Sequence, residues 1–132
     1  MREIDLSTER KTQLVDNTRQ VAEVLDGANG ASAALVFVPH TTAGVTIQEH
    51  ADPAVARDLE TATERMVGDD WGWQHIEAGE ENAPSHVRAS LAGPHVLVPV
   101  ENGRLALGTW QGIFFCEFDG PRRRKVYVTP LT

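Results

Sequence analysis

The sequence predicts an α+β fold, in which a largely antiparallel, β-sandwich-like sheet system is combined with about three helices. Short runs rich in apolar and β-branched residues recur along the chain and predict six to eight strands. Helix-capping residues precede only three segments. The later strands are separated by turns too short for helical crossovers, so they are expected to pair antiparallel.

The first half of the chain is predicted to form two short strands, a helix and a central strand. Residues 4–6 alternate apolar and charged side chains, as a half-buried strand does, and residues 14–15 can form a second strand. Capping residues then introduce a helix over residues 18–26, which two glycines end. Residues 31–38 are a β-rich apolar run that ends at a proline, which predicts a central strand.

The middle of the chain is predicted to form a strand at 45–48, a long helix and a loop at 68–82. The helix begins at Asp52 and Pro53, because an aspartate caps the first turn and proline is tolerated there. The loop is rich in Gly, Asp, Glu and Trp and has no period. The helix carries an apolar stripe at spacings of four, three and four, which predicts a core-facing side: Val55, Leu59, Ala62 and Met66.

The last third is predicted to form a short helix, a hairpin and two more strands. Asn82 is expected to cap the helix. The hairpin covers residues 96–107, and its turn contains Asn102 and Gly103, which favour positive φ. Residues 113–118 and 125–129 form the final strands.

Composition indicates one globular domain spanning residues 1–132 and excludes several partners. The net charge of −7 repels nucleic acid, and no stretch resembles a signal peptide or a membrane span, so we expect a cytoplasmic protein. Cys116 cannot form an internal disulfide and lies in an apolar run, where a buried thiol is expected. The basic run at 122–125 is expected to be a solvated turn before the last strand, with a small-anion site as the alternative.

Three histidines are the main candidates for chemistry: His40, His75 and His86. His40 follows the predicted central strand, at a position where functional side chains often project. The histidines are separated by 35 and 11 residues, which is no metal signature by itself, so scattered structural histidines remain the alternative. If the three converge, zinc fits best, with iron, nickel, copper or manganese as alternatives. His50 and His95 are interpreted as structural.

Other polar residues could bind a substrate. The segment 108–112 places a hydroxyl, an indole and an amide between two glycines, which predicts either a binding segment or a structural β-bulge. Arg88 could bind a phosphate or pair with a surface carboxylate. The candidate substrate-binding residues are Thr41, Thr42, Arg88, Ser90, Thr109 and Gln111.

Taken in order, these segments resemble the YjbQ-like family, whose members are also described as secondary thiamine-phosphate synthases. The most specific segments are HTTAGV and LGTWQG, and the likeness extends over nearly the whole chain. His50 stands where relatives often carry asparagine, and tryptophans occupy a loop where tyrosine is common. The resemblance is carried by residues 40–45, 49–53, His75, 82–86 and 103–111.

The resemblance implies an α+β sandwich-like fold, a homotrimer, and a divalent metal ion held by His40, His75 and His86. It also implies a transferase that joins a pyrimidine diphosphate to a thiazole phosphate, so that both substrates are small anions. With a diphosphate substrate, magnesium is the alternative to zinc as the bound ion. A metal-dependent hydrolase, with Glu49 as general base, is a second hypothesis. A non-enzymatic trimer that binds a small anion and uses a structural metal is a third.

Overall fold

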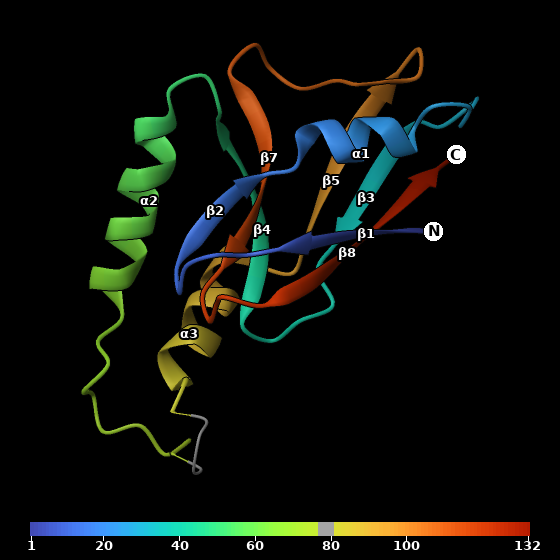
Figure 1. Ribbon diagram of the computed structural model, residues 1–132. Helices are drawn as coiled ribbons and strands as arrows, with labels where there is room; N and C mark the ends of the chain where they lie inside the picture. The colour runs from blue at the N-terminus through green and yellow to red at the C-terminus, as the bar shows by residue number, and fades with distance from the viewer. Residues whose placement is uncertain (77–80) are drawn as a thin grey trace.

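The computed structural model describes residues 1–76 and 81–132 (Figure 1). Within these ranges the chain forms eight strands and three helices, which confirms the predicted fold class. The strands are β1 (Arg2–Ser7), β2 (Gln13–Asp16), β3 (Ala33–Phe37), β4 (Ala43–Glu49), β5 (His95–Glu101), β6 (Arg104–Leu105), β7 (Gln111–Glu117) and β8 (Arg123–Leu131). The helices are α1 (Thr18–Val24), α2 (Pro53–Met66) and α3 (Ala83–Ala92).

The strands form two sheets in which every pair is antiparallel. The larger sheet has the order β1-β8-β3-β5-β6, and the smaller has the order β2-β7-β4. The predicted central strand, β3, is the middle strand of the larger sheet. At the predicted hairpin turn, Asn102 and Gly103 have φ values of 53° and 76°, which suit a two-residue turn between β5 and β6.

The hydrophobic core lies between the two sheets. Apolar side chains from alternate positions of each strand meet there, as the period of two predicts. Helix α1 contributes two valines to the same core, next to the edge strand β1. The fully buried core side chains include Val21, Val36, Val38, Val45, Val98, Ile113, Phe115, Val126 and Val128.

Helices α2 and α3 pack against the smaller sheet (Figure 1). The Asp52 side chain accepts a hydrogen bond from the Ala54 N–H, which confirms the predicted start of α2. The predicted core-facing stripe of α2 is wrong in its second half, because Ala62 is exposed, Met66 is 61% exposed, and Glu60 is the buried residue of this helix. Glu60 is held by Arg10 and by the Leu14 N–H, so polar contacts draw this side of the helix to the sheet.

Gly44 explains how closely α3 approaches β4. A Cβ atom at this position would lie 2.6 Å from the Gly93 carbonyl oxygen and 3.0 Å from the Ala92 Cβ. The absence of a side chain lets the end of α3 rest on the strand, where the Val45 N–H donates to the Gly93 carbonyl. The first turn of α3 is thereby set beside the loop that follows β3.

No helix in the described part of the chain is long and apolar enough to cross a membrane.

Candidate functional site

Two of the predicted histidines lie side by side. The ring centroids of His75, in the loop before α3, and His86, the fourth residue of α3, are 5.2 Å apart, with the rings edge to face. His86 Nδ1 lies 3.1 Å from the carbonyl oxygen of Thr41, which follows His40 in the loop after β3. The turn after the central strand and the start of α3 therefore meet at one end of the molecule.

Asn82 connects this pair to a second polar group. Asn82 lies at the start of α3, as predicted, but its side chain makes no capping hydrogen bond. Instead, Asn82 Oδ1 lies 3.0 Å from His75 Nε2, and Asn82 Nδ2 donates to Asp119 Oδ2 at 2.8 Å. Arg122 Nη2 donates to the same carboxylate at 2.7 Å. The sequence reasoning missed this role of Asn82 and Asp119, because the contact joins residues 37 positions apart.

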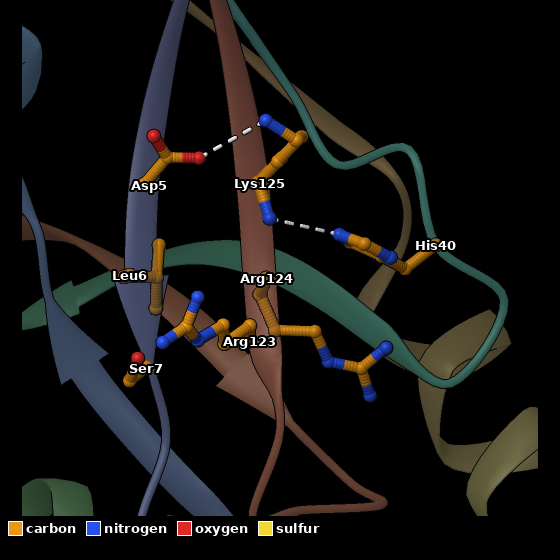
Figure 2. Close-up of a pocket in the computed structure, with 7 residues that line it drawn as sticks. All are labelled: Asp5, Leu6, Ser7, His40, Arg123, Arg124 and Lys125. Atoms are coloured by element: carbon orange, nitrogen blue, oxygen red, sulfur yellow. Dashed lines mark hydrogen bonds and ion pairs between the residues drawn. The ribbon is translucent and has the colours of Figure 1, made fainter.

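His40 lies next to the start of β8. Its Nε2 accepts a hydrogen bond of 2.9 Å from the Lys125 backbone N–H, as Figure 2 shows. Burial and the nearby charge of Arg124 lower the pKa of His40, so its neutral form is favoured. The Lys125 ammonium group points to Glu3 and Asp5 instead, and these carboxylates raise its pKa.

A buried ion pair supports the loop after His40. The Glu117 side chain is fully buried and pairs with Arg124, which also donates to Thr42 Oγ1 at 2.9 Å. Burial alone would raise the pKa of Glu117, but hydrogen bonds from Arg124, from Thr8 and from the Asp119 N–H lower it. The basic run at 122–125 is therefore only partly the solvated turn that was expected, because Arg124 is buried. In Figure 2, Arg123 and Arg124 project to opposite sides of β8.

Two cavities meet at His86. The first, of about 350 Å³, is polar and is lined by two arginines and an aspartate, whereas the second is a wide, open cleft of about 620 Å³ with an indole in its wall. The first is lined by Pro39, His40, Thr41, Thr42, Asn82, His86, Asp119, Arg122 and Arg124. The second is lined by Gly72, Trp73, Gln74, His75, Ala83, His86 and Val87.

Three predicted site residues lie at the opposite end of the smaller sheet. Ala43, next to Thr42, pairs with Glu117, while Glu49 pairs with Gln111 six residues further along the same two strands. At about 3.4 Å per residue, this separates the groups by about 20 Å. Thr109 lies in the exposed loop before Gln111, whose side chain accepts from the Gly108 N–H. Within the described residues, Glu49, Thr109 and Gln111 therefore lie away from His75 and His86.

Two other predicted substrate-binding residues, Arg88 and Ser90, donate hydrogen bonds to backbone carbonyls. Arg88 is buried, and its guanidinium donates to the carbonyls of Thr63, Glu64 and Val67 at the end of α2. It therefore satisfies carbonyl groups at the helix terminus and lies outside both histidine cavities. The exposed Ser90 hydroxyl donates to the His86 carbonyl one turn back along α3.

His50 also lies away from the other histidines. Its Nδ1 is 3.0 Å from Asp16 Oδ2, at the end of the smaller sheet where Glu49 lies. Although burial would raise the pKa of Asp16, hydrogen bonds from Thr18 and His50 lower it.

A metal ion needs several donor atoms that converge on one point. No group of three or more His, Cys, Asp or Glu within residues 1–76 and 81–132 is arranged to hold one. The His75–His86 pair has a spacing that suits two ligands of one ion. Two imidazoles bound to one tetrahedral zinc ion have ring centres roughly 5 Å apart, since each nitrogen lies about 2.0–2.1 Å from the ion and about 1.1 Å from its ring centre. The observed 5.2 Å fits two ligands of one ion.

The fold and this site define a class of protein: an α+β sandwich with a histidine-lined polar cleft after its central strand. The chain matches the family described as "UPF0047 protein YjbQ-like" over residues 2–132, and it belongs to this family. The UPF0047 protein YugU of Bacillus subtilis is 43% identical over 131 residues, which cover 97% of this chain and 96% of that protein. A UPF0047 protein of Archaeoglobus fulgidus is 40% identical over 129 residues, covering 98% and 99% respectively.

Solved structures show the same fold. A crystal structure of an uncharacterized conserved YjbQ/UPF0047 family protein from Clostridium acetobutylicum has a TM-score of 0.93 and 42% identity, and covers 99% of this chain and 100% of that one. The crystal structure of a conserved hypothetical protein from Thermus thermophilus has a TM-score of 0.87 and 38% identity, with coverage of 99% and 100%. The predicted family and fold are therefore confirmed.

Proposed function

We propose that this chain is a metal-dependent enzyme for small phosphorylated substrates, of the kind described as secondary thiamine-phosphate synthases. The observation that carries the proposal is the junction of the two cavities at His86, where a cavity lined by Arg122 and Arg124 adjoins a cleft with an indole wall. A substrate with a phosphate and a flat heteroaromatic ring needs both surfaces. Joining a pyrimidine diphosphate to a thiazole phosphate involves substrates of this class.

The arginine-lined cavity supplies groups for a phosphate. Arg122 and Arg124 line this space of about 350 Å³ together with Thr41, and each guanidinium also pairs with a carboxylate, Asp119 or Glu117 respectively. Arg124 is fixed by Glu117 and Thr42, which means that its charge needs little reorganisation when an anion binds. These contacts would bind and orient a phosphoryl group beside the histidines.

The cleft supplies a surface for a ring. The Trp73 indole N–H donates to the Gly68 carbonyl at 2.9 Å, and the ring stacks on Trp71 with centroids 5.8 Å apart. Trp73 is thus held in place while its position in the wall leaves it available to a ligand. Stacking on a fixed indole would orient a pyrimidine or thiazole with respect to His75 and His86.

The proposed metal ligands are His75 and His86, whose spacing fits one ion. Nε2 of the third expected ligand, His40, already accepts a hydrogen bond from the Lys125 N–H. A bound divalent ion, with zinc favoured by the imidazoles, would supply positive charge for a departing diphosphate. Magnesium would fit this donor set poorly, because it prefers oxygen ligands. A hydrolase that uses Glu49 as general base has less support, because Glu49 lies at the other end of β4.

The test is product formation from the two precursors. Purified protein loaded with zinc is incubated with the pyrimidine diphosphate and the thiazole phosphate, and thiamine phosphate is measured by chromatography. His86→Ala is the inactive control, and Thr61→Ala, at an exposed position of α2 that lines neither cavity, is the matched control. We expect turnover in the wild type and in Thr61→Ala. A wild-type rate no higher than that of His86→Ala would exclude this function, and bound zinc that only raises the melting temperature would favour the non-enzymatic trimer.

A homotrimer is also part of the proposal. Its support is the outer face of the larger sheet, where Leu97 is 57% exposed and Phe37 39% exposed, and where Phe37 stacks on Tyr127. Leu35 pairs with Leu97 in the register of β3 and β5, so the apolar side chains are contiguous. The helices pack against the smaller sheet and at the edge of the sandwich, which leaves this face available to a second copy.

A further inference from the structure

We propose that the three histidines carry their ring protons on different nitrogens and therefore have different roles: His75 and His86 are the metal ligands, and His40 is a hydrogen-bond donor to the substrate. This inference rests on the proposed function. It replaces a site of three equivalent imidazoles with a pair and a separate donor.

The proton of His75 is placed by Asn82 and Asp119. The Asp119 carboxylate can only accept hydrogen bonds, so the Asn82 amide must turn its NH₂ group towards Asp119, at 2.8 Å. Its carbonyl oxygen then faces His75 Nε2 at 3.0 Å, and a carbonyl oxygen requires an N–H. Arg122 donates to the same carboxylate and holds it in position. In neutral His75 the proton is therefore on Nε2, and Nδ1 has the free lone pair.

The proton of His86 is placed by the backbone. His86 Nδ1 lies 3.1 Å from the Thr41 carbonyl oxygen, which can only accept, so Nδ1 carries the hydrogen. Nε2 of His86 is then the unprotonated nitrogen. A metal-binding histidine commonly has its other ring nitrogen held in this way by a carbonyl or by a side-chain acceptor. Both members of the pair meet this condition, through Asn82 and Thr41 respectively.

His40 has the opposite arrangement. Its Nε2 receives the Lys125 backbone N–H at 2.9 Å, so the lone pair on Nε2 is already used. In the neutral ring the proton is on Nδ1, which cannot bind a metal in that form. Breaking the bond to Lys125 would leave a backbone donor at the start of β8 without its acceptor. His40 lines the same cavity as Arg122 and Arg124, where an N–H group suits a phosphate oxygen.

The first experiment locates the ring protons in the metal-free protein. Long-range ¹H–¹⁵N correlation spectra of uniformly labelled protein at pH 8 distinguish the two nitrogens of each histidine. We expect the proton on Nε2 in His75 and on Nδ1 in His40 and His86, although the Nε2–H form predominates in free histidine. A proton on Nε2 of His40 would overturn the inference. This readout does not depend on metal or on turnover, so it separates failure of the inference from failure of the proposed function.

The second experiment separates metal affinity from anion affinity by calorimetry with Zn²⁺ and with inorganic diphosphate. We expect His75→Ala and His86→Ala to weaken zinc binding at least about 10-fold, and His40→Phe to change it less than about 3-fold. In the zinc-loaded protein, His40→Phe should weaken diphosphate binding about 10-fold, the order expected for a lost hydrogen bond to a charged group. His40→Asn, which has an amide nitrogen near the Nδ1 position, should recover part of this loss.

Equal loss of zinc affinity in His40→Phe and His75→Ala would contradict the inference, as would diphosphate binding that is unchanged in His40→Phe. If wild-type protein bound no zinc, the proposed function would fail, and the spectra would still show whether the protons are distributed as described.

Discussion

Replacing Arg124 with methionine should destabilise the fold strongly, because it leaves a buried carboxylate without its cation. Glu117 is fully buried, and its carboxylate also accepts from Thr8 Oγ1 at 2.7 Å and from the Asp119 N–H at 3.0 Å. Removing one partner of a buried pair costs about 3–5 kcal/mol. Since the Thr8 and Asp119 donors remain, and methionine keeps much of the arginine stem, we expect a loss of about 3 kcal/mol at pH 8.

The cost should depend on pH in a defined direction. In the wild type the pKa of Glu117 is below its ordinary value of 4.5, so the pair stabilises the fold above pH 4.5. This stabilisation is lost as the pH falls through the native pKa. In Arg124→Met, burial without the guanidinium should raise the pKa of Glu117, so the carboxyl can take up a proton in mild acid. The deficit relative to the wild type should therefore be smaller at pH 5 than at pH 8.

Urea unfolding at both pH values measures these differences. Arg123→Met is the matched control, since the neighbouring Arg123 is exposed, and it should change the free energy of unfolding by less than about 0.5 kcal/mol. Adding Glu117→Gln to Arg124→Met should restore about 1 kcal/mol or more, because no buried charge then remains. A deficit below about 1 kcal/mol at pH 8, or an equal deficit at both pH values, would refute this account of the pair.

Three further changes test other parts of the structure. Gly44→Ala should destabilise the protein by about 1–3 kcal/mol in thermal melts, because the new Cβ would lie 2.6 Å from the Gly93 carbonyl; a neutral effect would mean that α3 sits further from β4. Cys116 should resist iodoacetamide at pH 8 in the native protein and react in urea, because burial raises the pKa of its thiol to about 12. Rapid labelling of the native protein, measured by mass spectrometry, would contradict this. Leu97→Lys on the outer face of the larger sheet should reduce the proposed trimer to monomer in light scattering, whereas Ser90→Lys, on α3, should not.

Features set by local contacts could be predicted from the sequence. The start of α2 follows from Asp52 and Pro53, and the hairpin turn follows from Asn102 and Gly103, because each depends on residues within a few positions of one another. The central position of β3 follows from its continuous apolar run. These signals need no knowledge of which segments meet in space.

The site depends on contacts that no local pattern encodes. The position of Asn82 at the start of α3 was predictable, but its side chain joins His75 to Asp119 instead of capping the helix. The guanidinium of Arg88 could be predicted to bind a phosphate or a carboxylate, yet its partners are backbone carbonyls at the end of another helix. Charge and hydrogen-bonding capacity can be read from a sequence, whereas the acceptor that satisfies them depends on how distant elements pack.

The buried ion pair and the proton positions of the histidines are physically linked. Arg124 holds Thr42, and the adjacent Thr41 carbonyl is the group that fixes the proton of His86. In Arg124→Met the loop after β3 loses this anchor, so the Thr41 carbonyl should no longer hold His86 in one tautomer. His75 should be unaffected, since its proton is fixed through Asn82 from the other side. A mixture of tautomers at His86, with His75 unchanged, would show that the ion pair positions one ligand of the pair as well as stabilising the fold.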